Sequence, residues 1–293
     1  MPLSSRTNSV IAIGSLALLA VAWGAIPLFV RADIPASHLV AMRVTLGAVV
    51  LVLFSMATKR FTVPRRRWRG IAVLGIALAA HWLAFFVALN LTTVAVTLAI
   101  LYVGPVLAAV LSGPLLHERV NRAAFVGLAV AVAGTLFVIR PGSGATVAGV
   151  VVAALSGVLL AVIMLLGKPL AADLGGLVVA TWELVVASIV LLPFTVQAAR
   201  ESGEYWPQFL ILGALFTGLA GVVYWTSMRR LPVAVVSVIM YLEPASAVVW
   251  AALFLGEQPD PLTWLGVVLV VAAGTIATRG VHDEEAVGVA ETL

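Results

Sequence analysis

Residues 92–121 read TTVAVTLAILYVGPVLAAVLSGPLLHERVN, and residues 231–260 read LPVAVVSVIMYLEPASAVVWAALFLGEQPD. The two stretches and their continuations share residues at one fixed offset of 139 positions: Ala95, Tyr102, Pro105, Glu118 and Gly127 recur as Ala234, Tyr241, Pro244, Glu257 and Gly266. Apolar helices align easily by chance, but a fixed spacing of tyrosine, proline, glutamate and glycine is harder to obtain that way. The stretches therefore predict a chain built from two related halves.

The composition puts both halves in a membrane. Hydrophobic residues make up 62% of the 293 residues and charged residues 10%, with a mean hydropathy of +1.15. A soluble domain carries roughly 25% charged residues, and a soluble fold of this composition would leave large apolar patches in water. The absence of cysteine from the sequence excludes disulfides, thiolate metal sites and cysteine nucleophiles.

Ten segments are long and apolar enough to cross a bilayer as helices of ~20 residues. The predicted spans are 9–30, 34–57, two within 70–116, 123–139, 146–167, 174–199, 206–228, 232–256 and 261–278. Because five helices is an odd number, the second half must enter the membrane from the opposite side, as in many secondary transporters. The predicted fold is an all-α integral membrane protein of ten transmembrane helices, arranged as two inverted five-helix repeats.

Lysine and arginine in the loops predict the orientation, because cytoplasmic loops carry an excess of both. With the N-terminus inside, thirteen of them face the cytoplasm and only three, Arg31, Arg140 and Arg200, face out. We therefore expect a multi-pass protein of the cell inner (plasma) membrane with both termini cytoplasmic. The expected divisions are a cytoplasmic N-terminus (1–8), the first repeat (9–139), a periplasmic linker (140–145), the second repeat (146–279) and a cytoplasmic tail (280–293).

Several short motifs resemble those of the EamA family in the drug/metabolite transporter superfamily. They are Trp23-Gly24 in the first span, Tyr102-x-x-Pro105 in the fourth, Tyr241-Leu242-Glu243-Pro244 in the ninth, and the acids Glu118 and Glu257. Within the family, the chain looks most like the YddG-type aromatic amino-acid exporters. The resemblance implies a ten-helix exporter whose central cavity is lined mainly by spans 1, 3, 4, 6, 8 and 9.

The candidate substrate-binding residues are aromatic or polar residues of the predicted spans: Trp23, His81, Phe85, Tyr102, Tyr224, Tyr241 and Glu243. The resemblance suggests that His81, Phe85 and Tyr102 face the substrate. Aromatic walls suit aromatic or apolar side chains, although each aromatic residue is also consistent with simple packing. Glu243 lies near mid-span, where a charge costs ~3 kcal/mol or more and needs a cavity or a partner.

Two of these residues are candidates for proton coupling, namely Glu243 and His81. The alternatives are that Glu243 anchors a substrate amine or forms a structural pair, and that His81 is a satisfied polar group between helices. Pro105 and Pro244 cannot donate a backbone N–H and are candidate hinge or gate residues, with a packing kink as the alternative.

Arg43 and Glu183 are predicted to be structural, as an ion pair, because the second and seventh spans do not usually line the family's cavity. Their difference in depth makes a direct bridge doubtful, and Arg43 with Glu243 is the preferred pair. At the start of the last span, Asp260 followed by Pro261 is typical of a helix N-cap, and Asn121 matches it in the first half.

The function expected from these features is export of amino acids, aromatic and other neutral ones, or of similar small amphipathic metabolites by alternating access. The alternatives are an exporter of drugs or quaternary amines and, less favoured, a facilitative channel. No enzyme is expected, because the spans contain scattered acids, no HExxH motif and no cysteine. We expect no cofactor and no metal. The expected partners are a small-molecule substrate and the lipid bilayer, with no nucleic acid; the oligomeric state is left open, and a monomer is consistent with the sequence.

Overall fold

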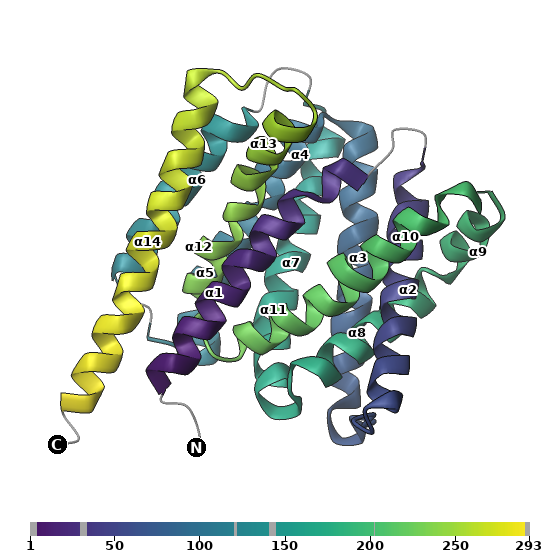
Figure 1. Ribbon diagram of the computed structural model, residues 1–293, viewed down its shortest axis with the longest axis horizontal. Helices are drawn as coiled ribbons and strands as arrows, with labels where there is room; N and C mark the ends of the chain where they lie inside the picture. Colours follow the sequence, from purple (N-terminus) through teal and green to yellow (C-terminus); the bar gives the residue numbers. More distant parts are fainter. Residues whose placement is uncertain (1–4, 30–33, 120–121, 141–144, 202, 291–293) are drawn as a thin grey trace.

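The computed structural model of the protein describes residues 5–29, 34–119, 122–140, 145–201 and 203–290, with side chains from Thr7 to Thr278. Arg31, Asn121 and residues 141–144 of the predicted linker lie outside the described residues. The described chain is a bundle of helices without strands, as predicted (Figure 1). The start of α1 and the end of α14 lie at the same end of the bundle (Figure 1).

The first half consists of α1 (Ser5–Gly24), η1 (Ile26–Phe29), α2 (Ala36–Ala57), η2 (Arg65–Arg67), α3 (Trp68–Leu91), α4 (Val94–Leu101), α5 (Val103–Leu116) and α6 (Arg122–Ile139). The second half consists of α7 (Val147–Leu174), α8 (Gly176–Val190), α9 (Leu192–Glu201), η3 (Gly203–Tyr205), α10 (Trp206–Gly213), η4 (Ala214–Leu219), α11 (Ala220–Met228), α12 (Val233–Met240), α13 (Leu242–Phe254) and α14 (Pro261–Ala290). Among the described residues, nine helical stretches are long and apolar enough to cross a membrane, and a bent pair of helices makes up to ten.

The seventh span differs from the straight helix predicted over 174–199. It is split at Leu191 into α8 and α9, whose axes differ by 76°. Pro193 has no N–H to donate to the carbonyl four residues earlier, so α8 cannot continue through it. The short helix α9 packs on α2, where the hydroxyls of Thr45 and Thr195 lie 3.0 Å apart.

The fourth and ninth spans break at equivalent positions of the repeat. The first breaks at Tyr102, between α4 and α5, and the second at Tyr241, between α12 and α13. Each break lies three residues before a proline, Pro105 or Pro244, which removes a helical hydrogen bond. Bent helices at these prolines were expected from the sequence; a hinge or gate role remains a prediction.

The last helices of the two halves, α6 and α14, pack on each other through small residues. A Cβ added to Gly134 would lie 2.8 Å from the Gly266 carbonyl oxygen, and one added to Gly266 would meet the Gly134 carbonyl in turn. Such reciprocal close contacts let the backbones approach, as small residues commonly do in membrane helices.

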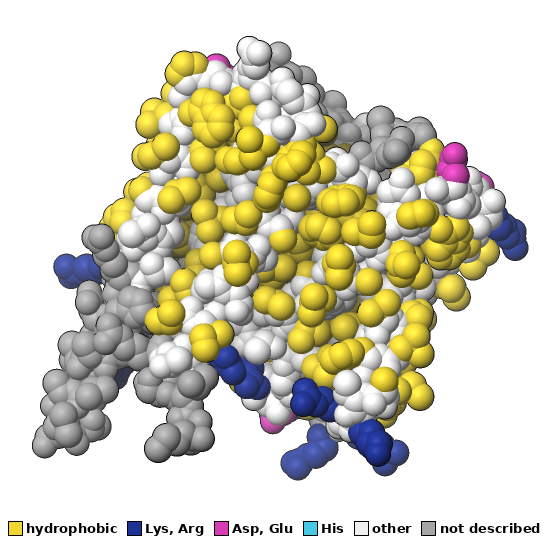
Figure 2. Space-filling model, in the orientation of Figure 1, with side chains coloured by type: hydrophobic (Ala, Val, Ile, Leu, Met, Phe, Trp, Pro, Cys, Tyr) yellow, Lys and Arg dark blue, Asp and Glu magenta, His cyan; other side chains and the backbone are white. Residues whose placement is uncertain are grey.

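The surface separates into an apolar belt and a basic end. Figure 2 shows hydrophobic side chains over most of the visible face and most of the visible lysine and arginine side chains at its lower edge. We call this the basic end; its exposed cations come from the α2–α3, α5–α6 and α11–α12 connections and include Lys59, Arg60, Arg65, Arg66, Arg67, Arg69, Arg119, Arg229 and Arg230. The belt exposes large apolar side chains such as Leu18 and Val147, as expected of a lipid-facing surface.

Candidate functional site

The two helix breaks bring Tyr102 and Tyr241 together across the boundary between the halves. The Tyr241 hydroxyl donates a 2.5 Å hydrogen bond to the Tyr102 carbonyl, and the ring centroids lie 5.3 Å apart. Closer to the basic end, the Ser237 hydroxyl donates to the Pro105 carbonyl at 2.9 Å. Residues predicted from the repeat therefore form a seam between α5 and α12.

Glu243 lies beside this seam, in the first turn of α13, and is half-buried. Its carboxylate interacts with the Tyr102 hydroxyl and with the Arg43 guanidinium. In the described part of the chain, however, no lysine, arginine or histidine nitrogen lies within 4 Å of it. Glu243 and Arg43, the pair preferred from the sequence, thus face each other without closing an ion pair.

Arg43 lies in α2 with only 7% of its surface exposed. Its Nε donates to the Thr217 hydroxyl at 2.9 Å and its Nη2 donates to the Phe216 carbonyl at 3.4 Å. Its guanidinium carbon lies 5.2 Å from the ring centroid of Trp82, at cation–π distance. Arg43 is therefore held by three neutral groups from α3 and η4.

The predicted ion pair between Arg43 and Glu183 does not form, since the two are not within 4 Å of each other. Glu183 instead accepts a 2.6 Å hydrogen bond from the indole N–H of Trp225, and it is buried between α8 and α11. The physical reason is that each residue packs on a different part of the second half: Arg43 on Thr217 and Phe216 of η4, and Glu183 on Trp225 of α11.

A π-helical turn explains how Arg43 reaches the site. η4 is π-helical, and the Thr217 hydroxyl donates at 2.8 Å to the carbonyl of Leu212, five residues earlier. The backbones of α2 and η4 also approach closely: a Cβ added to Gly47 would lie 2.9 Å from the Gly213 carbonyl oxygen. Single π-helical turns are frequent at functional sites.

Trp23 and Tyr224 extend the same cluster with aromatic surface. The Trp23 indole N–H donates to the Phe216 carbonyl at 2.9 Å, the carbonyl that also accepts from Arg43. The rings of Trp23 and Tyr224 are 6.0 Å apart at centroid, and both are half-buried. In the Trp23-Gly24 motif, the glycine allows close packing on α13, since a Cβ there would lie 2.6 Å from the Glu243 carbonyl oxygen.

His81 and Phe85 are arranged differently from the other predicted residues. His81 is buried, and its Nδ1 lies 2.9 Å from the Ser156 carbonyl and 3.0 Å from the Ser156 hydroxyl. This is the environment of a satisfied polar group between α3 and α7. Phe85 is half-buried, and its ring is 5.9 Å from that of Trp82.

The structure thus gathers one set of residues, which we call the central cluster: Trp23, Arg43, Trp82, Tyr102, Thr217, Tyr224, Tyr241 and Glu243. Sequence reasoning missed Trp82 and Thr217 as members and gave Arg43 only a structural role. One signal was available, because Gly213 and Thr217 have the spacing of a close helix contact. Nothing in the sequence indicated a π-helical turn at that contact.

A polar network ties the halves together at the basic end. The Glu118 carboxylate accepts a 2.8 Å hydrogen bond from the backbone N–H of Val233, at the start of α12. Lys168 of α7 pairs with Glu118 and donates to the Leu231 carbonyl. The side chains of Glu118 and Lys168 are only 13% and 16% exposed, so the network is shielded from solvent.

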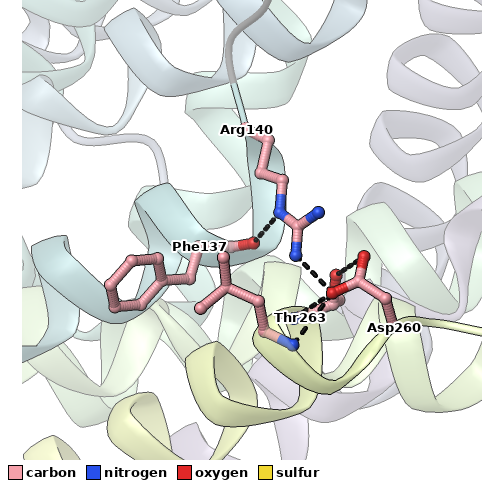
Figure 3. Close-up of polar contacts among 5 residues, drawn as sticks. Phe137, Arg140, Asp260 and Thr263 are labelled. Carbon is pink, nitrogen blue, oxygen red and sulfur yellow. Dashed lines mark hydrogen bonds and ion pairs between the residues drawn. The ribbon is translucent and has the colours of Figure 1, made fainter.

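A second ion pair joins Arg140 and Asp260 (Figure 3). Arg140 follows α6 and Asp260 precedes α14, at the end of the bundle opposite the basic end (Figure 1). The Asp260 carboxylate also accepts from the backbone N–H groups of Leu262 and Thr263 at 2.9 and 3.2 Å, which confirms the predicted N-cap of α14. The hydrogen bond from Arg140, followed by these backbone bonds, lowers the pKa of Asp260 to about 2. Both side chains are exposed, so this pair contrasts with the shielded network at the basic end.

No group of three or more histidine, cysteine, aspartate or glutamate side chains suited to hold a metal ion occurs in the part of the chain that the structure describes. The polar groups of the central cluster are a guanidinium, a carboxylate, hydroxyls and indoles, together with the backbone carbonyls of Tyr102 and Phe216. Such groups can recognise a small charged molecule.

Comparison with known proteins points to one family. Residues 10–140 and residues 147–279 each match the EamA-like transporter family. The threonine/homoserine exporter RhtA of Escherichia coli is 27% identical over 251 residues, covering 83% of this chain and 82% of RhtA. A probable terminal-alkyne amino-acid exporter of Streptantibioticus cattleyicolor is 29% identical over 280 residues, covering 92% and 93% of the two chains.

The fold also matches a solved structure. A protein crystal structure superposes with a TM-score of 0.79, covering 93% of this chain and 98% of the other, at 22% identity. At that level of identity the likeness concerns the fold alone. The two separate family matches agree with a chain made of two repeats.

Proposed function

The chain belongs to the EamA-like transporter family, and from this premise we propose that it exports neutral amino acids, aromatic ones among them, by alternating access. Members of this family are transporters, and the fold is that of a multi-pass membrane protein. Two relatives are named as exporters of threonine and homoserine and of an amino acid. Their names support amino acids as the substrate class.

The observation that carries the proposal is the central cluster. Side chains from both halves converge on the two helix breaks. Six of the eight are half-buried, namely Trp23, Trp82, Tyr102, Thr217, Tyr224 and Glu243. In inverted-repeat transporters, the substrate site lies near the midplane where broken helices of the two halves meet. A cluster that combines aromatic surface with opposite charges suits a small amphipathic molecule.

The predicted site residues divide into two groups under this proposal. Trp23, Tyr102, Tyr224, Tyr241 and Glu243 contact or face the substrate. His81 holds α3 against α7 through Ser156, and Phe85 supports Trp82 from the side. These contacts favour a supporting role for His81 and Phe85; direct contact of either residue with the substrate, as the sequence suggested, stays an untested prediction.

We further propose that the basic end faces the cytoplasm. The exposed lysines and arginines of three connections gather there, as the positive-inside rule requires. The start of α1 and the end of α14 lie at this same end (Figure 1), so both termini would be cytoplasmic. Labelling of a tag at either terminus from one side of sealed cells tests this orientation.

The test of function is exchange in proteoliposomes. The purified protein is reconstituted into vesicles loaded with one unlabelled amino acid, and uptake of the labelled amino acid is measured for all twenty. We expect exchange of several neutral amino acids, stimulated by substrate on the opposite side. Arg66→Gln, a change in the exposed short helix η2, is the control and should exchange like the wild type.

Two results would replace the proposal with an alternative. If no amino acid exchanges but quaternary amines do, the protein is a drug-type exporter. If amino acids pass without stimulation from the opposite side, a facilitative channel explains the flux, because a channel does not cycle between two states.

A further inference from the structure

Arg43 is a buried cation whose charge is held in position but not neutralised. Its partners are a hydroxyl, a backbone carbonyl and the face of an indole ring. Among the described residues, no carboxylate oxygen lies within 4 Å of it. A charge inside a membrane bundle is costly unless it is paired or faces a polar cavity, so this arrangement calls for an anion.

The guanidinium has hydrogen-bonding capacity left for such an anion. It carries five N–H donors in a fixed planar fork. Nε is used by Thr217 and one Nη2 proton by Phe216, whereas Nη1 has no hydrogen-bond partner in the described part of the chain. A free edge of this fork matches a carboxylate in bidentate geometry, which is the strongest of the common charged hydrogen-bond pairs.

Glu243 provides a complementary charge that does not touch the Arg43 guanidinium. It interacts with Arg43 electrostatically, although the two groups are more than 4 Å apart. Glu243 comes from the second half and Arg43 from the first, so this unclosed pair of charges spans the boundary between the two halves. An unclosed pair of opposite charges can accept a molecule that carries both charges on neighbouring atoms.

The repeat offers this arrangement only once. At the offset of 139 residues, the position equivalent to Glu243 in the first half is Gly104, and the position equivalent to Arg43 in the second half is Trp182, one residue before Glu183. The Glu183 carboxylate already accepts a hydrogen bond from the indole N–H of Trp225. Among the described residues, the repeat therefore provides this unclosed pair of charges once and not twice.

We infer that Arg43 and Glu243 form a receptor for the zwitterionic head of an α-amino acid, with Arg43 binding the carboxylate and Glu243 binding the ammonium group. This inference rests on the proposed function and extends it from a substrate class to a mode of recognition. Thr217 and Phe216 hold the guanidinium at Nε and Nη2, and Trp82 contacts its face, so the Nη1 side is left for the carboxylate. The aromatic members of the central cluster would then contact the side chain of the amino acid.

The test compares molecules that share a side chain and differ in the head group. In the exchange assay, phenylalanine, phenethylamine and 3-phenylpropionate compete with the labelled substrate, and so do threonine, 1-aminopropan-2-ol and 3-hydroxybutyrate. For the wild type, we expect the amino acid to compete at least about tenfold more strongly than the amine or the acid of its set.

Each variant should remove the preference for one charged group of the amino acid: Arg43→Gln for the carboxylate, and Glu243→Gln for the ammonium group. In Arg43→Gln, the amino acid and the amine should compete within about threefold of each other, while discrimination against the acid persists. In Glu243→Gln, the pattern should reverse: the amino acid and the acid converge, and the amine stays weak. A merely structural role for either residue would weaken all three competitors together, and that result would overturn the inference.

A conservative variant and a measurement of folding provide the controls for this test. Arg43→Lys keeps the charge but loses the fork, so it should retain the preference for the carboxylate with affinity reduced about threefold to tenfold. Thermal unfolding shows whether each variant is folded; if Arg43→Gln is not, Arg43→Lys and Glu243→Gln decide. If wild-type vesicles exchange no amino acid, the proposed function and the inference fail together. If they do exchange but Arg43→Gln keeps the wild-type preferences, only the inference fails.

Discussion

The α5–α12 crossing and the α4–α13 crossing are equivalent under the repeat, yet they are packed very differently. α5 and α12 lie against each other, all eight residues of α12 are buried, and the Ser237–Pro105 and Tyr241–Tyr102 hydrogen bonds join them. At the opposite end, α13 packs mainly on α1 and α14, α4 packs mainly on α7, and only three of the thirteen residues of α13 are buried.

The difference suggests what state the molecule occupies. Under the proposed alternating access, two related halves in opposite orientation would pack tightly at one crossing or at the other, in two states of similar energy. We interpret the structure as the state that is closed at the basic end. The Glu118–Lys168 network lies at the closed crossing, whereas Glu257, the equivalent of Glu118, is exposed and makes no ion pair among the described residues.

The largest effect is expected at Glu243, which lies between the two crossings. If a proton on this acid couples the two states, Glu243→Gln removes the carrier, and uptake driven by a pH gradient should fall about a hundredfold or more. His81→Ala should leave the pH response intact, because His81 is committed to Ser156. The measurement is uptake into proteoliposomes with and without a pH gradient. An unchanged pH response in both variants would favour facilitated diffusion.

The second largest effect is expected for a variant that favours opening of the α5–α12 crossing. Glu118→Gln removes one partner of a shielded ion pair and leaves Lys168 unpaired, a change that costs up to about 3 kcal/mol. The cost falls on the state closed at the basic end, so a population shift of tenfold or more toward the other state is expected.

The cysteine-free sequence allows a direct measurement of that shift. A single cysteine replaces Val235, which is buried in α12, and its reaction with a water-soluble maleimide is followed. The rate should rise about tenfold with Glu118→Gln. Glu257→Gln is the matched control at the equivalent position and should not change the rate; equal rates in all three proteins would remove the role of the network.

A smaller change is expected at the seam between the two tyrosines. Tyr241→Phe keeps the ring contact with Tyr102 and removes one hydrogen bond across the halves, worth about 1 kcal/mol. The same maleimide assay should show a rise of roughly fivefold, because only one bond of the crossing is lost. A decrease in rate would mean that the bond opposes closure at the basic end.

The smallest effect is expected at the Arg140–Asp260 pair. Because the pKa of Asp260 is lowered to about 2 in the folded protein, its contribution to stability is present above its ordinary pKa of 3.8 and is lost as the pH falls toward 2. Asp260→Asn keeps an N-cap residue and removes the charge, so the melting temperature at pH 7 should fall slightly.

The variant of the partner residue and the double variant provide the control for that prediction. Arg140→Gln, the other half of the pair, should lower the melting temperature by a similar amount, and the double variant should add little. Additive losses in the double variant would show that the two side chains act independently of each other.

The spans and their breaks could be predicted because their signals are local. Runs of apolar residues mark the helices, Pro105 and Pro244 mark the breaks, and Asp260 with Pro261 marks the start of α14. The 76° bend was missed, although Pro193 was visible, because the apolar run of the seventh span continues past it.

The position of Arg43 could not be predicted for a different reason. In a membrane helix that is apolar all round, the sequence does not show which face points inward, and only packing decides it. The π-helical η4 and the close contact of Gly47 with Gly213 bring Arg43 to Thr217 and Phe216. Both features depend on two spans that are far apart in the sequence.

Paired spin-label distances show whether the α5–α12 and α4–α13 crossings exchange their roles during transport. One pair, at Val94 and Leu255, reports on the α4–α13 crossing; another, at Arg119 and Arg230, reports on the α5–α12 crossing. With Glu118→Gln or a transported amino acid, the first distance should shorten while the second lengthens. Distances that stay fixed, or that change in the same direction, would contradict the account.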